Sequence, residues 1–530
     1  MDLSDGDYSD PPEPVDQAHV LTPRELSFQR YGFFASVLIV NTLSILLAYL
    51  QHQGTAIFTV ILFIKSRDIL SVVITVVGMI ARSVDRFFNP VPPITSQFIL
   101  TLIPAYSESQ EQILKAIHAL RNNGVEPHHQ VMLVILDGKP VDIKSSMTKV
   151  CKELERPHDT FKGKRISLGI TAGFIGDVPV LVIQKRRNSG KKDTLIMTND
   201  IFNYPRDNMP VLTRRLRREI WLDVLPELTA GFPVPFTKFD MIFNTDADSK
   251  IHQGALLRLA NSLVREPRAI ASCGLVLVEF EEGCEWSAWN MYQQFQYCYG
   301  QYVRRGAEHI WGKVTCLPGC ITMIKVMPEC GPAMKKYAAA ITGRNAIAHQ
   351  VQYLGTDRRQ TYCFLSQSRD LKTLFIPNAV SETVAPQSLT HYLSQRRRWG
   401  SNAYFNNYFY CFGENMALIT RTVAFLELVR LTMVYWRFSN TIQFVTTLIR
   451  QLAGGTFAPI TLAPLISIGQ LPLFWFIFCV IKERPLRERM HKLALGWMIN
   501  KTVAPFMSMA VFTKVAMNIG SQVWGLTGTS

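Results

Sequence analysis

Two kinds of apolar segment alternate along the chain: long runs without charge, and short runs that end in polar residues. Residues 31–50 contain no charged side chain, and about twenty such residues cross a hydrocarbon core as a helix. Residues 55–81 are also apolar, but Lys65, Arg67 and Asp68 interrupt them. This pattern predicts either a long helix whose charges face protein or a shorter span after an interfacial piece. Arginines follow, so the positive-inside bias places the next residues in the cytosol.

Similar patterns predict the membrane elements near the C-terminus. Residues 431–449 and 457–481 are expected to span the bilayer, and the basic loop at 482–489 is expected on its cytosolic side. Residues 493–512 are apolar but contain a lysine and a proline, which favours a re-entrant or interfacial helix. The acidic, proline-containing residues 1–29 lack the pattern of a signal peptide and are expected to be disordered.

Between these regions, short apolar runs predict an α/β domain. Strands are expected at 97–103 and 131–136, and residues 111–121 between them have apolar side chains at helical spacing. This is a β-α-β unit, and open α/β sheets bind ligands at the carboxyl ends of their strands. Residues 139–176 are charged, and we expect them to form an irregular insertion on the rim of the sheet.

Polar segments also follow two further predicted strands. The strand at 180–184 leads into a basic, glycine-containing loop, 185–193, which suits a pyrophosphate although its spacing is not that of a P-loop. The strand at 239–244 leads to Asp246 and Asp248. Two carboxylates at a strand end can share a divalent cation and the diphosphate oxygens that it bridges. An acidic surface turn is the alternative for this pair.

Three other stretches are suited to binding. Their residues can contact sugars or phosphates, or form a turn where a ligand can approach the backbone closely. Residues 285–304 combine Trp, Tyr and Gln, which stack on sugar rings and bond hydroxyls, although aromatic residues at helical spacing are also typical of a core. Residues 395–399 read Gln-Arg-Arg-Arg-Trp, in which the guanidiniums suit the phosphates of a nucleotide-sugar. Alone, such a run is also typical of a solvated helix face. A tight turn at 315–320 precedes a strand at 321–326.

Composition narrows the class of protein. The 530 residues are 48% hydrophobic, enough for one soluble core and several membrane spans. The formal charge of +15 suits phosphates or anionic lipid. Nucleic acid is disfavoured, because no zinc-finger, RNA-recognition or helix-turn-helix pattern occurs. The ten cysteines are scattered through apolar surroundings, which fits reduced thiols, and Cys316 and Cys320 lack a second pair of zinc ligands nearby.

In their order along the chain, the motifs resemble those of a known family. They read Asp137-Gly138, Asn188-Ser189-Gly190-Lys191-Lys192-Asp193, Asp246-Ala247-Asp248, Cys316-Leu317-Pro318-Gly319-Cys320, Gly355-Thr356-Asp357-Arg358 and Gln395-Arg396-Arg397-Arg398-Trp399. This order resembles the processive family 2 glycosyltransferases, and most of all the chitin synthases, over residues 101–402. Trp524-Gly525 extends the resemblance to the tail.

The resemblance implies a GT-A fold and an inverting transfer from UDP-N-acetylglucosamine, with Mn or Mg, that builds and exports a β-1,4-linked chain. It implies that Asp357 is the general base and that Asp248 is the metal ligand. The donor would be bound by Tyr106, Glu108, Asp137, Lys191, Asp246, Gln395 and Arg398. The acceptor would lie against Trp399, Gln293, Phe295, Tyr297, Cys316 and Gly319, and Trp524 would belong to a gating loop.

The sequence departs from the chitin synthase pattern in two places. Thr356 precedes the base where Glu is usual, and the basic loop reads Gly-Lys-Lys rather than Gly-Lys-Arg. Neither change removes a group that the chemistry requires. The chain is also short for a fungal chitin synthase. A hyaluronan-like synthase that uses two donors, or another β-glycan synthase, therefore stays open, as does a non-catalytic membrane scaffold.

We therefore expect an α/β GT-A domain, with a mixed sheet and flanking helices, embedded between transmembrane and interfacial helices. The expected segments are a disordered tail (1–29), transmembrane helices (30–82), a cytosolic catalytic domain (95–390), the active-site motif with interfacial helices (391–430), transmembrane helices (431–481), and a basic loop, re-entrant or interfacial helix and gating tail (482–530). The expected partners are a UDP-sugar, the growing polysaccharide and the lipid bilayer, and a homo-oligomer stays open. The localisation expected is a multi-pass protein of the plasma membrane.

Overall fold

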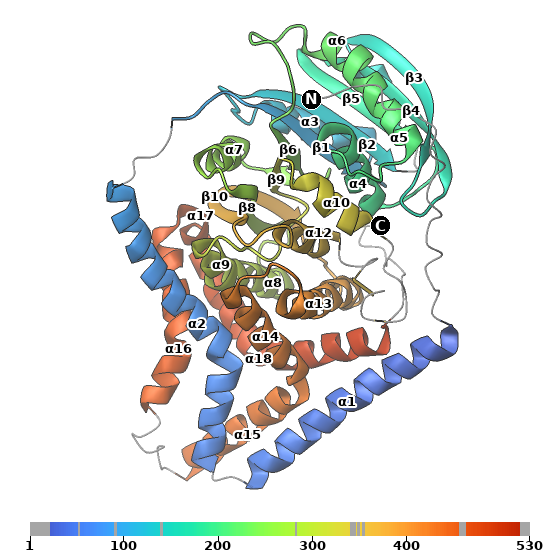
Figure 1. Ribbon diagram of the computed structural model, residues 1–530. Helices are drawn as coiled ribbons and strands as arrows, with labels where there is room; N and C mark the ends of the chain where they lie inside the picture. The colour runs from blue at the N-terminus through green and yellow to red at the C-terminus, as the bar shows by residue number, and fades with distance from the viewer. Residues whose placement is uncertain are drawn as a thin grey trace.

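A single mixed sheet of ten strands organises the described part of the chain (Figure 1). The computed structural model describes residues 22–50, 53–88, 93–137, 141–280, 283–339, 346, 350–351, 356–454 and 463–519. The strands lie in the order β3-β4-β5-β2-β1-β6-β9-β8-β10-β7. The mixed sheet is the one expected of the catalytic domain.

The centre of the sheet is parallel and buried on both faces. Its strands are β1 (Phe98–Ala105), β2 (His129–Asp137), β5 (Val178–Lys185) and β6 (Met241–Asn244). In β1, Leu100 and Leu102 join the core on one face, whereas Ile99 and Ile103 join the core on the other. Continuous apolar runs are typical of strands buried in this way. The four strands predicted from these runs are confirmed.

The remaining strands extend the sheet on both sides. On the far side of β6 lie β7 (Lys250–Ile251), β8 (Ala269–Glu279), β9 (Thr322–Lys325) and β10 (Lys372–Val384). On the β5 side lies a long antiparallel hairpin of β3 (Lys149–Asp159) and β4 (Arg165–Ile175). The irregular insertion expected at 139–176 is therefore wrong, although its place on the rim is right. Alternate side chains of β3 face solvent, and their charges hide the period of two on which strand prediction depends.

Helices cover both faces of the sheet. They are α3 (Gln110–Arg121), α4 (Lys191–Phe202), α5 (Val211–Glu219), α6 (Leu225–Thr229), α7 (Ala255–Arg265), α8 (Ala288–Tyr299), α9 (Gly306–Ile310), α10 (Cys330–Ala338) and α12 (Thr356–Leu365). Helix α3 shows why these segments fold locally: Ser109 and Gln112 form a reciprocal capping box, and Ile113, Ile117 and Leu120 are buried. The helix predicted at 111–121 is confirmed.

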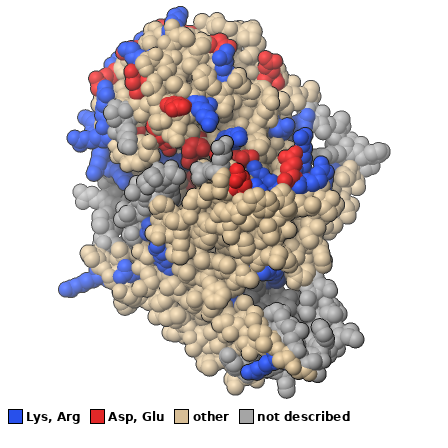
Figure 2. Space-filling model, turned by 180° about the vertical axis from the view of Figure 1, so that it is seen from behind, with Lys and Arg blue, Asp and Glu red and all other residues tan. Residues whose placement is uncertain are grey.

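Long helices lie on one side of the α/β domain (Figure 1). They are α1 (Pro23–Leu50), α2 (Gln53–Phe88), α13 (Leu389–Phe412), α14 (Leu418–Thr432), α15 (Val434–Ala453), α16 (Ala463–Lys482) and α18 (Met490–Met517), with the short α17 (Arg484–Arg487) before the last. Figure 2 shows charged side chains mostly on the α/β domain, and few on the described surface of the helices below it.

The helices differ in two places from the expectation. Helix α1 begins at Pro23, so the last residues of the expected disordered tail are helical. Helix α18 is continuous through Pro505 and packs against α8 and α13, so of the two forms expected for residues 493–512 it is not re-entrant, and an interfacial helix stays a prediction. Contacts with the α/β domain decide its course, and the sequence alone does not show them.

Among the described helices, one is long and apolar enough to cross a membrane by length and composition, over Pro23–Leu47. A shorter apolar segment, Gly469–Lys482, lies in α16. Charged residues interrupt the other long helices, as in α2. The start of the span expected at 457–481 lies outside the described residues. A multi-span topology therefore stays a prediction.

Candidate active site

A cavity of about 1720 Å³ lies where β1, β2, β5 and β6 end and continues between the long helices. Its lining includes nearly all of the residues singled out in the sequence: Tyr106, Glu108, Asp137, Lys191, Asp246, Asp248, Phe295, Tyr297, Cys316, Gly319, Asp357, Gln395, Arg398 and Trp399. Gln293 does not line it, and Trp524 lies outside the described residues. Segments far apart in the chain thus meet at one place.

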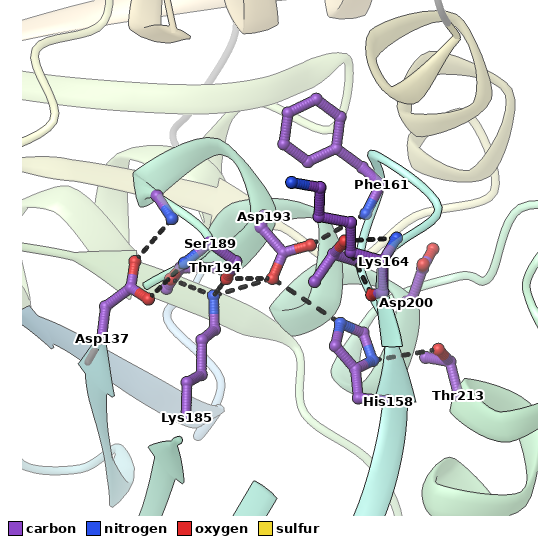
Figure 3. Close-up of polar contacts among 12 residues, drawn as sticks. Asp137, His158, Phe161, Lys164, Lys185, Ser189, Asp193, Thr194, Asp200 and Thr213 are labelled. Atoms are coloured by element: carbon purple, nitrogen blue, oxygen red, sulfur yellow. Dashed lines mark hydrogen bonds and ion pairs between the residues drawn. The ribbon is translucent and has the colours of Figure 1, made fainter. Parts of the chain in front are cut away.

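Asp137, at the end of β2, shapes the basic loop. Its two carboxylate oxygens accept hydrogen bonds from the backbone N–H groups of Ser189 (2.9 Å) and Gly190 (2.8 Å), as Figure 3 shows. Gly190 has a φ of +88°, which favours glycine, and helix α4 begins at the next residue. The expectation for Asp137 was a contact with the donor. The structure adds a second task, because Asp137 sets the course of the loop that presents Lys191.

A buried ion pair supports this loop from beneath (Figure 3). The fully buried amine of Lys185 donates to Ser189 Oγ (2.8 Å), Asp193 Oδ2 (2.8 Å) and Thr194 Oγ1 (2.9 Å). Burial alone would raise the pKa of Asp193, but Lys185 and His158 hold it well below its ordinary value. Neither Lys185 nor His158 was expected in this role. The available signal was a lysine at the end of an apolar strand, which needs an anionic partner when buried.

Lys191 lies among three groups of the expected site. Its amine is 2.5 Å from Asp246 Oδ1. Burial alone would lower the pKa of Lys191, but the carboxylates of Asp246 and Asp357 raise it above its ordinary value. The backbone N–H of Gly319 donates to Asp357 Oδ2 (3.2 Å). A Cβ at Gly319 would lie 2.7 Å from the Lys191 amine and 3.1 Å from Asp357 Oδ1, so this glycine allows the lysine and the carboxylate to meet.

The acidic groups beside Lys191 fit a divalent cation. Burial, Asp246 and Glu108 raise the pKa of Asp248 to about 6. This unfavourable gathering of negative charge is what a hard cation with oxygen ligands relieves. No group of three or more His, Cys, Asp or Glu side chains placed to hold a metal occurs among the described residues. The phosphate oxygens of a ligand would therefore have to complete the coordination.

The arginines of the 395–399 motif point in different directions, because α13 is a helix and successive residues are about 100° apart. Arg398 and Gln395 line the cavity, and burial together with Arg397 lowers the pKa of Arg398 to about 10. Arg397 is buried away from the cavity lining. Arg396 packs against the rings of Trp399 (4.5 Å), Tyr392 (4.9 Å) and Tyr297 (5.3 Å). Arg396 and Arg398 thus line the cavity and Arg397 does not, so the expectation that all three guanidiniums suit phosphates is corrected for Arg397.

The aromatic segment 285–304 is only partly turned to the cavity. Phe295 and Tyr297 line it, as does Trp399, which is 44% exposed, so part of its indole is open to a ligand although Arg396 packs against the ring. Gln293 instead donates its amide to the backbone oxygen of Pro386 (2.9 Å), so its expected contact with the acceptor is corrected. Gln296, one helical turn away from it on α8, lines the cavity.

Comparisons with known proteins agree on one family. A family model described as chitin synthase matches residues 175–499. Chitin synthase 8 of Gibberella zeae is 22% identical over 454 residues, which cover 82% of this chain and 67% of that protein. Chitin synthase 5 of Verticillium dahliae is 25% identical, over 59% of this chain and 19% of that protein. Chitin synthase E of Aspergillus fumigatus is 26% identical, over 60% and 18%. The chain thus spans about two thirds of the first relative and less than a fifth of the other two.

Solved structures resemble the chain only distantly. A mannosyltransferase of Pyrobaculum calidifontis, in complex with GDP-Man and Mn²⁺, has a TM-score of 0.36 at 11% identity and covers 84% of this chain and 99% of its own. GalNAc-T7 with UDP, GalNAc and Mn²⁺ has a TM-score of 0.28 at 10% identity, over 59% and 50%. These scores are too low to support an inference about this chain.

Proposed function

Because this chain belongs to the chitin synthase family of glycosyltransferases, we propose that it is a processive, inverting β-glycan synthase. It transfers N-acetylglucosamine from UDP-N-acetylglucosamine to the 4-hydroxyl of a growing chain and exports the product. The resemblance inferred from the motifs is confirmed at the level of the family. Donor, linkage, processivity and export are our proposals.

One observation carries the proposal: a candidate base, phosphate-binding cations and an exposed aromatic face line the same cavity. The Asp357 carboxylate lies beside the Gly319 backbone, Lys191 and Arg398 supply positive charge, and Trp399 presents its indole face. A sugar transfer that releases a nucleoside diphosphate requires these groups together.

In the proposed reaction, the acceptor hydroxyl oxygen bonds to the anomeric carbon of the donor while the bond from that carbon to the diphosphate breaks. Asp357 takes the hydroxyl proton, and Lys191, Gln395 and Arg398 hold the departing UDP. Asp248, with Asp246, would hold Mn or Mg, which supplies positive charge to the diphosphate. Tyr106, Glu108 and Asp137 would complete the donor site.

The acceptor chain would lie on Trp399 and beside Phe295, Tyr297, Cys316 and Gly319. From there the cavity runs between the long helices, where Arg437, Gln470 and Lys501 line it. We propose this direction as the exit of the product through the bilayer, with the α/β domain in the cytosol and the plasma membrane as its location. Trp524 stays a proposed gating residue.

A second candidate, a hyaluronan-like synthase, is favoured by the charge of the helical part of the cavity. Its lining contains Lys65, Arg67, Arg304, Arg305, Arg430, Arg437 and Lys501 but, among the described residues of this part, only Asp68, Glu308 and Glu427 as carboxylates. An excess of cations would suit an acidic chain more than a neutral one. The two candidates differ in whether one UDP-sugar is sufficient for turnover or two are required.

The test supplies the purified protein, in detergent with Mn²⁺, with each UDP-sugar alone and in pairs, and measures release of UDP. We expect turnover with UDP-N-acetylglucosamine alone. Turnover that requires UDP-glucuronate as well would replace the chitin-like function with the hyaluronan-like one. Absence of turnover with every donor, in protein shown to be folded, would support a non-catalytic scaffold.

A further inference from the structure

The tip of the β3–β4 hairpin, residues 160–165, overhangs one end of the cavity. Strand β4 runs antiparallel to β5 with Leu168 opposite Lys185, the last residue of β5, so the residues before Leu168 extend past the end of that strand. They thereby reach the basic loop that follows β5. The residues that line this end of the cavity are Thr160, Lys162, Lys164, Arg165, Ile166, Arg187 and Asn188.

The hairpin tip is held in place by bonds within the turn. The backbone N–H of Thr160 donates to the Lys164 carbonyl (2.9 Å), and that of Gly163 donates to the Thr160 carbonyl (2.8 Å). Gly163 has a φ of +72°, which favours glycine in such a turn. None of these bonds uses the side chain of Lys164, so this side chain can be changed without removing them.

Helix α4 fixes the position of the tip over the cavity. The backbone N–H of Phe161 donates to Asp193 Oδ1 (3.0 Å), a contact visible in Figure 3. The Lys192 amine lies 4.9 Å from the centre of the Phe161 ring. Asp193 also accepts a hydrogen bond from the Lys185 amine. One carboxylate therefore connects the hairpin tip to strand β5 and to helix α4, in which Asp193 lies.

Two cations of this rim form no ion pair with a carboxylate among the described residues. Arg165 pairs with Asp159 at 2.9 Å, whereas Lys164 and Arg187 are exposed and line the cavity without such an ion pair. The family model begins at residue 175, so the tip lies outside the matched region. Membership of the family therefore does not assign it a role.

We infer that residues 160–165, together with Arg187 of the basic loop after β5, form a binding lip for a nucleoside diphosphate, in which Lys164 and Arg187 attract and hold the phosphates. The inference rests on the proposed function, because a donor that carries a diphosphate is the ligand on which these charges act. The lip supplies positive charge in addition to the proposed donor-binding residues at the strand ends. Because salt screens exposed charges, the affinity for the nucleotide should depend on salt concentration.

The test is a calorimetric titration of the full chain in detergent with UDP and Mn²⁺, at low and at high salt. The variant is Lys164→Ala/Arg187→Ala, and we expect its Kd for UDP to rise about tenfold at low salt. The difference from the parent protein should shrink at high salt, which loss of a merely structural contact would not produce. Lys164→Arg/Arg187→Lys keeps both charges and should bind UDP nearly as the parent does.

The matched control is Lys149→Ala/Lys152→Ala, which removes the same net charge from strand β3 at residues outside the cavity lining. Equal Kd values for the tip variant and this control would overturn the lip. A parent protein that binds no UDP would instead overturn the proposed donor and the lip with it. Circular dichroism and thermal unfolding of each variant would verify its fold.

Discussion

At Gly319, the backbone lies close to two side chains of the candidate site, Asp357 and Lys191. Its N–H contacts the Asp357 carboxylate, and the space of its missing side chain is bordered by the Lys191 amine. Glycine is therefore selected here by a close approach, since its φ does not lie in the left-handed region. The proposed base Asp357, the Lys191 amine and the turn at Gly319 depend on one another at this point.

Gly319→Ala should slow sugar transfer on the order of 100-fold, because a small displacement of reacting groups is costly. The added Cβ would lie 2.7 Å from the Lys191 amine, the mobile end of a side chain, so the amine should shift while the protein stays folded. Initial transfer rates and thermal unfolding together check this. Gly231→Ala, with nothing within 4 Å of its Cβ, is the control. A parental rate in Gly319→Ala would show that the position of the amine does not matter.

Asp357→Asn should retain UDP affinity while transfer falls by about a hundredfold or more, because an amide cannot accept the proton. Arg398→Ala should instead weaken UDP binding, since it removes a charge-assisted contact. Calorimetric affinities beside initial rates separate the two effects. Asp370→Asn, on an exposed aspartate, is the matched control. Rapid transfer by Asp357→Asn would place the base elsewhere.

Asp248→Asn should abolish the dependence of UDP binding on Mn²⁺, because it removes a charged ligand from the site. UDP titrations with Mn²⁺ and with a chelator measure this dependence in parent and variant. If the parent binds UDP equally well in both conditions, Asp248 is not a metal ligand under the conditions of the assay.

At the scale of elements, the basic loop that presents Lys191 is held between strand β5, helix α4 and the β3–β4 hairpin. Lys185 ends β5, Asp193 lies in the first turn of α4, and His158 of β3 lies 3.6 Å from Asp193. Each element thus contributes one titratable group to a buried cluster. Disruption of the pair should loosen the loop that presents Lys191.

Lys185→Met should lower the free energy of unfolding by about 3–5 kcal/mol, because it leaves a buried carboxylate without its main partner. Lys185→Met/Asp193→Asn should recover part of this loss, since both charges are then gone. Thermal unfolding in detergent compares the variants. A double variant less stable than Lys185→Met would contradict this reason.

The stability that the Lys185–Asp193 pair contributes depends on pH. The folded pKa of Asp193 is lowered, so the stability that it contributes is present above about pH 4, the ordinary pKa of Asp, and is lost as the pH falls through the folded value. Asp193→Asn should therefore lose less stability than the parent on acidification below about pH 4.

At the scale of the whole molecule, a charged α/β domain packs against a group of long helices, and the described surface of these helices has few charges (Figure 2). Exposed apolar residues of α1 include Leu43, Leu46 and Leu47. Contiguous apolar surface of this kind needs lipid or protein to cover it. The cavity runs from the domain into the helices, so catalysis and export would share one space.

The full chain should remain in the membrane pellet after extraction at alkaline pH, which releases proteins held only by charge. Immunoblots of pellet and supernatant measure this, with a known peripheral protein as the control. Release of the chain into the supernatant would contradict a spanning α1 and favour interfacial attachment.

The sequence by itself determined the parallel centre of the sheet and the family, but not the β3–β4 hairpin. Buried parallel strands are continuous apolar runs, so β1, β2, β5 and β6 were predicted from pattern alone, and the motifs at their ends were found with them. Asp246 was singled out by its place after a predicted strand and Arg398 by its basic run, whereas Asp357 was assigned only because the motifs resemble those of a known family.

Only the tertiary structure decided which faces and partners these residues have. Helical rotation turned Arg397 away from the cavity lining and Gln293 toward Pro386, and both had been expected at the ligand. Folding of the rim brought His158 to Asp193 and Phe161 to the same carboxylate, although more than thirty residues separate them in the chain. Such contacts depend on the packing of whole elements, because nothing in a local pattern states which residue of a distant strand will lie opposite a buried charge.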